Sequence, residues 1–280
     1  TTWHTAATQD TRLLRRQLDI VNSLPKQYVF LNYLRCHDDI GWGLDYKWLR
    51  QNCGTDEKAH KRFLSDWFQG RWEGSVSRGE LYTSGDARQC GTTASLCGIE
   101  KAGFEHDPAA MERAVRFDLT LHAMMFMQTG LPLLYSGDEL AQVNDYSYKD
   151  DPKKAEDSRY LHRGKFRWDL EDHAHDLSTP EGQVFCGLNA LNALRKTNAA
   201  FCARADVWTL DTGDNGLLAI GRYFEGQKII GVFNFTPWDK TVTFPHDPGE
   251  FADMLTGEPY ILRDLTVPAY GFYYLEQSQS

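Results

Sequence analysis

The apolar positions follow a helical period near the start of the chain. In residues 10–24 they recur every three or four positions until Pro25 ends the pattern, so we expect a helix there. The next apolar run, residues 28–34, is short and rich in aromatic and β-branched side chains, which is typical of a buried strand. The pattern therefore predicts a helix that leads into a strand.

Residues 41–106 lose this regularity and are rich in aromatic residues. A connection of this length is far longer than an ordinary loop, so we expect a folded subdomain with a functional role. It contains one short predicted helix, residues 58–69. We expect Phe63, Trp67 and Phe68 on this helix to form a small core.

A long helix is predicted after this subdomain. Asp107 is a favourable N-cap residue and Pro108 a favourable first helical residue. The helical pattern continues to about residue 128, and Gly130 is suited to the helix end. The apolar run at residues 131–135 then predicts a second strand.

A charged loop and a further helix follow. Residues 140–177 combine many charged and aromatic side chains, which by composition alone suits a mobile surface segment. Because they follow a predicted strand, we expect them at the mouth of an α/β barrel. Residues 178–181 have the sequence of a capping box, and the apolar residues behind them recur at helical intervals.

After Asn198 the apolar positions alternate instead of following a helical period. Short apolar runs separated by turn sequences predict an antiparallel β domain. The expected strands are residues 207–210, 217–223, 228–235, 240–244, 260–262 and 267–275.

Composition excludes several functions. The net charge of −9 argues against a nucleic-acid partner, and no apolar run is long enough to span a membrane. The six cysteines show neither metal-ligand spacing nor the density of a disulfide scaffold. We therefore expect a soluble protein with free thiols, with a cytoplasmic location slightly favoured over secretion. The chain has no phosphate-binding glycine loop or metal motif, so neither a cofactor nor a metal is expected.

The candidate chemistry lies directly after the first predicted strand, where His37, Asp38 and Asp39 are adjacent. In parallel α/β barrels the side chains at the carboxyl ends of strands form the active site. The alternative is an ordinary solvated turn or helix cap, because Asp favours both. Spacing alone leaves both interpretations open.

The whole stretch RCHDDIGW, residues 35–42, resembles the last conserved segment of the α-amylase superfamily, glycoside hydrolase family 13. It is most similar to the amylosucrase branch, although Cys36 stands where many members of the superfamily carry Asn. Three further stretches support the resemblance, and their order along the chain also matches. GDARQCG at residues 85–91 and DSRY at residues 157–160 resemble segments of the amylosucrase branch, and LPLLYSGDE at residues 131–139 is similar to the eighth barrel strand of the superfamily.

This resemblance implies an α/β fold: the C-terminal part of a TIM (β/α)8 barrel with an inserted subdomain, followed by an all-β C-terminal domain. Residues 1–40 would form a barrel helix and the seventh strand, and residues 41–106 the inserted subdomain. Residues 107–198 would form the last barrel helices and the eighth strand, and residues 199–280 the antiparallel β domain.

The resemblance also implies roles for single residues. Asp38 would stabilise the transition state by holding hydroxyl groups of the glucosyl ring, with His37 donating a hydrogen bond beside it. Asp39 would contact the donor sugar, and Arg88 would reach the acceptor.

Two more residues are expected to bind substrate. Arg159 would form the pocket floor through an ion pair with a carboxylate from the missing N-terminal half of the barrel. Trp42 lies directly beyond the acidic residues and is a candidate for stacking on a sugar ring.

The function implied is that of a retaining glucosyltransferase that takes glucose from sucrose, extends an α-1,4-glucan and releases fructose. Its nucleophile and acid/base would lie on earlier barrel strands, upstream of Thr1. We therefore expect the present chain to be inactive alone and to need the N-terminal half of the barrel as partner. A sucrose hydrolase and a non-catalytic carbohydrate-binding or assembly module are the alternatives.

Overall fold

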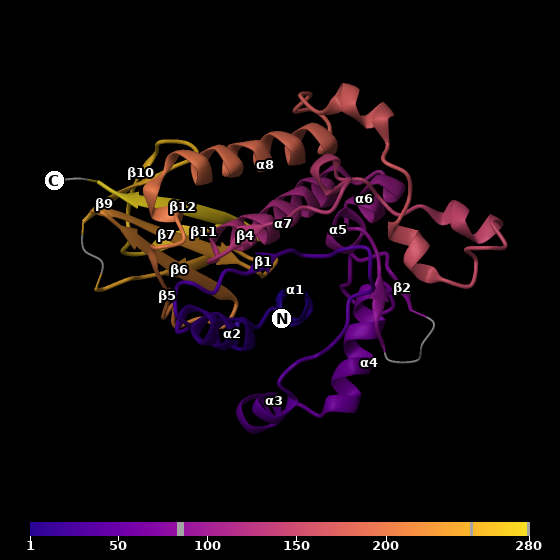
Figure 1. Ribbon diagram of the computed structural model, residues 1–280, viewed down its shortest axis with the longest axis horizontal. Helices are drawn as coiled ribbons and strands as arrows, with labels where there is room; N and C mark the ends of the chain where they lie inside the picture. Colours follow the sequence, from indigo (N-terminus) through magenta and orange to yellow (C-terminus); the bar gives the residue numbers. More distant parts are fainter. Residues whose placement is uncertain (83–86, 247–248, 279–280) are drawn as a thin grey trace. The chain divides into compact units, whose positions relative to one another are not determined.

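The computed structural model describes residues 1–82, 87–246 and 249–278. The chain divides into two compact units, coloured along the sequence in Figure 1. The first unit contains Thr1–Asn32, Leu119–Leu133 and Gly187–Ser280. The second unit contains Tyr33–Asp118 and Leu134–Cys186. Two long helices, α7 (Pro108–Met127) and α8 (Pro180–Thr197), contribute residues to both units.

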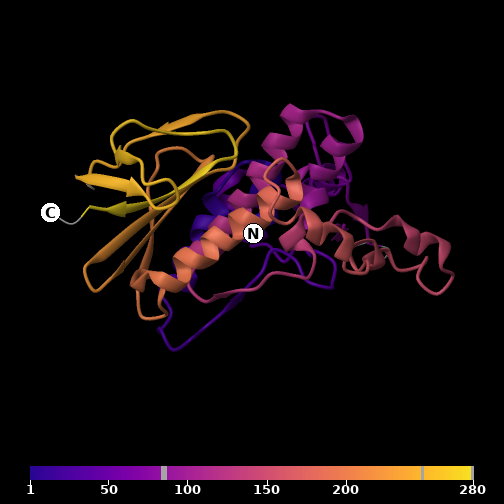
Figure 2. The same ribbon diagram turned by 90° about the horizontal axis from the view of Figure 1, so that it is seen from above.

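The predicted β domain is present in the first unit, where its strands gather in both views (Figures 1 and 2). Its main sheet is antiparallel and has six strands in the order β10-β9-β12-β7-β6-β5. The strands are β5 (Asp206–Leu210), β6 (Leu217–Phe224), β7 (Gln227–Asn234), β9 (Glu250–Asp253), β10 (Pro259–Ile261) and β12 (Phe272–Gln277). A smaller antiparallel sheet pairs β8 (Lys240–Val242) with β11 (Leu265–Val267).

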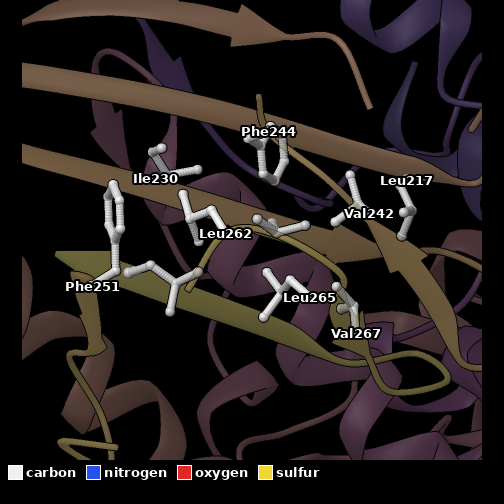
Figure 3. Close-up of a cluster of buried hydrophobic side chains, with 11 residues drawn as sticks. Leu217, Ile230, Val242, Phe244, Phe251, Leu262, Leu265 and Val267 are labelled. Carbon is white, nitrogen blue, oxygen red and sulfur yellow. The ribbon is translucent and has the colours of Figure 1, made fainter. Parts of the chain in front are cut away.

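Apolar side chains from both sheets meet in one core, where they point toward one another (Figure 3). Val232 and Leu275 come from the main sheet and Val242 and Val267 from the smaller one, and all are buried. The alternating pattern of the sequence thus corresponds to strands with one face toward this core.

Two strand predictions in this domain were incomplete. Residues 267–275 form two strands instead of one, because the chain turns after Pro268 and Tyr270 has a φ of 50°. Strand β9 was not predicted, since it is short and begins and ends with acidic residues. The expected turn before it includes Asp247 and Pro248, which lie outside the described residues.

The first unit also contains the helices α1 (Thr2–Thr8) and α2 (Arg12–Asn22) and the short 3-10 helix η5 (Ala199–Phe201). Helix α2 contacts strand β5. The first predicted helix corresponds to α2. The two predicted barrel strands are shorter than expected, because only β1 (Leu31–Asn32) and β4 (Leu131–Pro132) satisfy the parallel pairing.

Helix α7 begins where the sequence predicts. The carboxylate of Asp107 accepts hydrogen bonds from the backbone N–H groups of Ala109 and Ala110, both at 3.0 Å. For α8 the cap is shifted by one residue from the expected capping box, since the Thr179 hydroxyl accepts from the N–H of Gly182 at 3.1 Å. Both helix starts are confirmed, and both are fixed by local side-chain chemistry.

The second unit contains short helices, loops and a small two-stranded antiparallel sheet. The predicted helix at 58–69 is α4 (Glu57–Phe68), and Phe68 is buried there. The rings of Phe63 and Trp67 are 5.8 Å apart, so these residues pack together as expected. The other elements are α3 (Tyr46–Cys53), β2 (Glu80–Leu81), β3 (Gln89–Cys90), α5 (Thr93–Cys97), α6 (Ile99–Glu105), and the 3-10 helices η1 (Asp138–Leu140), η2 (Tyr146–Asp150), η3 (Ser158–His162) and η4 (Trp168–His173).

Across residues 1–82, 87–246 and 249–278, none of the helices combines the length and the apolar character that a membrane span requires.

Candidate active site

The second unit contains an open pocket of about 580 Å³ on the segment that follows β1. Asp38, Asp39 and Trp42 line it from this segment, and Arg88 and Arg159 reach it from two distant parts of the sequence. Gly41, Gly43 and Lys61 complete the lining. Five of the six residues selected from the sequence therefore face one cavity, and the sixth, His37, is adjacent to Asp38 in the chain.

A buried ion pair anchors the segment that carries these residues. Arg35 Nη2 lies 2.8 Å from Asp138 Oδ1, and both side chains are only 2% exposed. The Arg35 guanidinium also lies over the ring of Tyr135, 4.6 Å from its centroid. Because removal of either charge would leave the other buried and unpaired, this pair holds the two loops together.

His162 makes a second contact with the segment that carries His37 and Asp38. Its Nδ1 accepts the N–H of Gly91 at 3.1 Å, and its Nε2 lies 3.4 Å from the carbonyl oxygen of His37. Burial, followed by the nearby charge of Arg35, lowers the pKa of His162 to about 4. The ring is therefore neutral at pH 7, and with Nδ1 as acceptor its proton sits on Nε2, from which it is donated to His37.

Arg163 fixes His37 and Asp38 together. Its Nε donates to the carbonyl oxygen of His37 at 2.5 Å, and its Nη2 lies 3.4 Å from Asp38 Oδ1. Arg163, Arg35 and His162 were not among the residues predicted from the sequence. Their positions are a weak signal, since Arg35 begins the RCHDDIGW stretch and the other two lie within three residues after DSRY.

The side chain of Asp38 is 53% exposed, and its carboxylate lies between a guanidinium group and an imidazole ring. Its Oδ1 is 3.4 Å from Nη1 of Arg159, whereas its Oδ2 is 3.4 Å from Nε2 of His37. This arrangement orients the carboxylate and leaves it open to the pocket. A charged group held in this way can accept hydrogen bonds from the hydroxyl groups of a neutral ligand.

Arg159 has its closest ionic partner inside this chain. Its Nε and Nη2 both lie 2.9 Å from oxygens of Asp157, which is a forked contact. The hydrogen bond from Arg159 lowers the pKa of Asp157. The guanidinium also lies 5.0 Å from the centroid of the Tyr82 ring. The expected carboxylate partner from another part of a barrel stays a prediction, and Asp157 is the partner that the sequence reasoning missed.

Asp39 and Arg88 form a second ion pair in the pocket lining. Arg88 Nη1 lies 3.4 Å from Asp39 Oδ2, and the Asp39 side chain is 8% exposed. Backbone hydrogen bonds in both directions between Ile40 and Gln89, at 2.8 and 3.0 Å, bring the two side chains together. Two residues of the GDARQCG stretch, Gly85 and Asp86, lie outside the described residues.

Trp42 lines the pocket, and a stacking contact and a hydrogen bond fix its side chain. Its ring stacks on Phe68 with centroids 5.7 Å apart and an angle of 18°, and its Nε1 donates to the carbonyl oxygen of Ala87 at 2.6 Å. The residue is 8% exposed. Since Phe68 covers one face of the indole, stacking on a sugar needs the other face, and this role stays a prediction.

The lining as a whole combines carboxylates with guanidinium and ammonium groups. Carboxylates accept hydrogen bonds from hydroxyl groups, and Arg and Lys donate to hydroxyl oxygens, so the pocket suits a polyhydroxylated ligand.

No family model matches the chain. Among solved structures, it is similar to an α-amylase from Geobacillus thermoleovorans complexed with acarbose, with 14% identity and a TM-score of 0.53. It is also similar to a sucrose 6F-phosphate phosphorylase from Thermoanaerobacter thermosaccharolyticum, with 19% identity and a TM-score of 0.58. The alignments cover 99% and 93% of this chain but only 47% and 45% of those chains.

The chain thus spans slightly less than half the length of either enzyme. These similarities concern the fold, and they confirm the fold class expected from the sequence. The α/β chain matches the fold of the C-terminal part of such enzymes, and its six-stranded antiparallel sheet fits an all-β C-terminal domain.

Proposed function

We propose that this chain is the C-terminal part of a retaining glucosyltransferase of the amylosucrase type. The complete enzyme takes glucose from sucrose, extends an α-1,4-glucan and releases fructose. One observation carries this proposal: Asp38, Asp39, Trp42, Arg88 and Arg159 come from three separate stretches that resemble amylosucrases, and they line one pocket. The fold of a sucrose 6F-phosphate phosphorylase supports it further.

Asp38 acts on the glucosyl ring in this proposal. A retaining reaction passes through transition states that resemble an oxocarbenium ion, in which the ring distorts and its hydroxyl contacts strengthen. An oriented carboxylate stabilises such a positive charge best in a site that excludes water. Arg159 and Arg163, each 3.4 Å from Oδ1, hold Asp38 in place, and His37 adds a hydrogen bond beside it.

Asp39 and Arg88 extend the site beyond this ring. Asp39 contacts the donor sugar, while Arg88, which is more exposed, reaches toward the acceptor glucan. The ion pair between them links the donor and acceptor sides. Replacement of Arg88 is therefore expected to alter the product distribution more than the consumption of sucrose.

The nucleophile and the acid/base belong, in this proposal, to other strands of a complete barrel. Retention needs two carboxyl groups about 5 to 5.5 Å apart on either side of the scissile bond. Asp38 supplies neither a covalent bond nor a proton, so the partner of this chain is the N-terminal half of the barrel. The exposed apolar residues Tyr28, Val29, Leu31 and Leu131, on and beside β1 and β4, suit contact with further barrel elements.

Product analysis of the complete protein incubated with sucrose tests this function. Release of fructose together with glucan that stains with iodine is expected. Equal amounts of free glucose and fructose without glucan would identify a sucrose hydrolase. Glucan binding without any cleavage of sucrose would identify a non-catalytic binding module.

A further inference from the structure

Cys36, His37 and Asp38 bring a sulfur, a nitrogen and an oxygen ligand into one small space. One potential ligand atom from each side chain lies within 4.8 Å of the others, which makes this a candidate metal-binding group among the residues that the structure describes. Cys36 Sγ lies 3.4 Å from the backbone nitrogen of Asp38, and His37 Nε2 lies 3.4 Å from Asp38 Oδ2. The sequence motifs gave no expectation of a metal.

This donor set suits a thiophilic divalent cation. Zn²⁺ binds thiolate at about 2.3 Å and imidazole or carboxylate at about 2.0–2.2 Å, and it accepts three protein ligands with a fourth position left open. Ligands around a tetrahedral Zn²⁺ are then roughly 3.3–3.8 Å apart. The three ligand atoms, all within 4.8 Å of one another, need to approach by only about 1 Å to reach this spacing, and His37 and Asp38 are exposed while Cys36 is half-buried.

The surrounding contacts leave the group available to a cation. The backbone is fixed, because Arg163 and His162 both approach the carbonyl oxygen of His37. The guanidinium groups of Arg159 and Arg163 lie against Oδ1 of Asp38, whereas Oδ2 faces His37. A cation on Oδ2 can therefore bind without displacing either arginine, although their charges weaken its affinity.

We propose that Cys36, His37 and Asp38 bind Zn²⁺ or a similar thiophilic divalent cation, and that the bound ion inhibits the enzyme by occupying Asp38. The metal site stands on the geometry alone. The inhibition rests on the proposed function, since it requires Asp38 to contact the sugar. The ion is an inhibitor that competes with substrate for the carboxylate.

Titration of the reduced protein with Co²⁺, followed by absorption spectroscopy, tests the metal site. We expect one equivalent to bind with a thiolate-to-cobalt charge-transfer band, and Zn²⁺ to abolish that band. Cys36→Ser should remove the band, and His37→Gln should keep it while weakening binding at least 10-fold. Cys186→Ser is the matched control, because Cys186 is also half-buried and a hydroxyl can keep its contact with the carbonyl oxygen of Ala174.

Absence of a charge-transfer band at saturating Co²⁺, or a band that persists in Cys36→Ser, would overturn the proposed metal site.

In the complete enzyme, Zn²⁺ should lower sucrose turnover and a chelator should restore it. The inhibitory concentration should rise at least 10-fold in Cys36→Ser, with each protein compared with its own metal-free rate. Cobalt binding with turnover that Zn²⁺ leaves unchanged would overturn the inhibition, whereas cobalt binding by a protein inactive even without metal would overturn the proposed function instead.

Discussion

The two oxygens of Asp38 have different neighbours, and this difference links the residue to both proposals. Oδ1 lies against two guanidinium groups, which hold the carboxylate toward the pocket. Oδ2 lies 3.4 Å from His37 Nε2 and is, in the two proposals, the oxygen that a hydroxyl group or a cation contacts. Because the side chain is about half exposed, its role should be separable from folding.

Asp38→Asn in the complete enzyme should lower kcat for sucrose by about 10³-fold, which corresponds to roughly 4 kcal/mol of activation free energy. The free energy of unfolding should change by less than about 0.5 kcal/mol, as is usual for an exposed residue. Asp169→Asn is the control, since Asp169 is also exposed and paired with an arginine, Arg167, away from the pocket lining. Near-normal turnover of Asp38→Asn, measured in steady-state assays, would remove Asp38 from the mechanism.

His162 should make stability depend on pH. Its pKa is about 4 in the folded chain, below the unfolded value of about 6.5, so on acidification the unfolded state takes up a proton first. The His162 contribution is thus complete above about pH 6.5 and is lost as the pH falls toward 4, by up to about 3 kcal/mol. Urea denaturation at several pH values should show a shallower acid loss in His162→Asn.

His106→Asn provides the comparison for this experiment. His106 is exposed and has a φ of 53°, a conformation that Asn also adopts. This variant should keep the acid dependence of the original protein. An unchanged slope in His162→Asn would show that His162 titrates normally in the folded chain.

Among the elements, the junction between α7 and β4 depends on one glycine. Gly130 has a φ of 107°, and a Cβ atom there would lie 2.4 Å from the carbonyl oxygen of Phe30. The Leu131 N–H donates to the same oxygen at 2.8 Å, so the close approach belongs to the parallel pairing of β1 with β4. A side chain at this position must push the two strands apart.

Gly130→Ala should therefore lower the free energy of unfolding by about 3 kcal/mol or more. Gly213→Ala measures the cost of a positive φ alone, because Gly213 has a φ of 69° but a Cβ atom there would meet nothing within 4 Å. We expect this control to lose about 1 kcal/mol. Equal losses in urea denaturation would mean that the contact with Phe30 is not what requires glycine.

Elements whose ends are set by neighbouring residues were predicted well from the sequence. Elements whose length depends on pairing with residues far along the chain were not. Asp107 and Pro108 mark the start of α7 because capping is local chemistry. The length of β1 depends on pairing with β4, about a hundred residues later, so the apolar run overstated it. The pair of Arg35 with Asp138 spans 103 positions, and no local spacing predicts it. The pocket residues were found because the resemblance joined separate motifs.

At the scale of the whole molecule, the short parallel sheet is the element that the proposed partner would complete. The parallel sheet has only two strands within the described residues, and Leu31, Leu131 and Leu133 on or beside it are exposed. Edges of this kind are normally covered in α/β folds. We propose that the remaining strands of a barrel cover them and add the nucleophile and the acid/base to the pocket.

Fructose release from sucrose, measured for the chain alone and after co-expression with the proposed N-terminal half, tests this account most directly. We predict no release by either part alone, release by the assembled protein, and loss of that release when the chain carries Asp38→Asn. Fructose release by the 280-residue chain alone would contradict the account, because Asp38 would then not depend on a nucleophile from elsewhere.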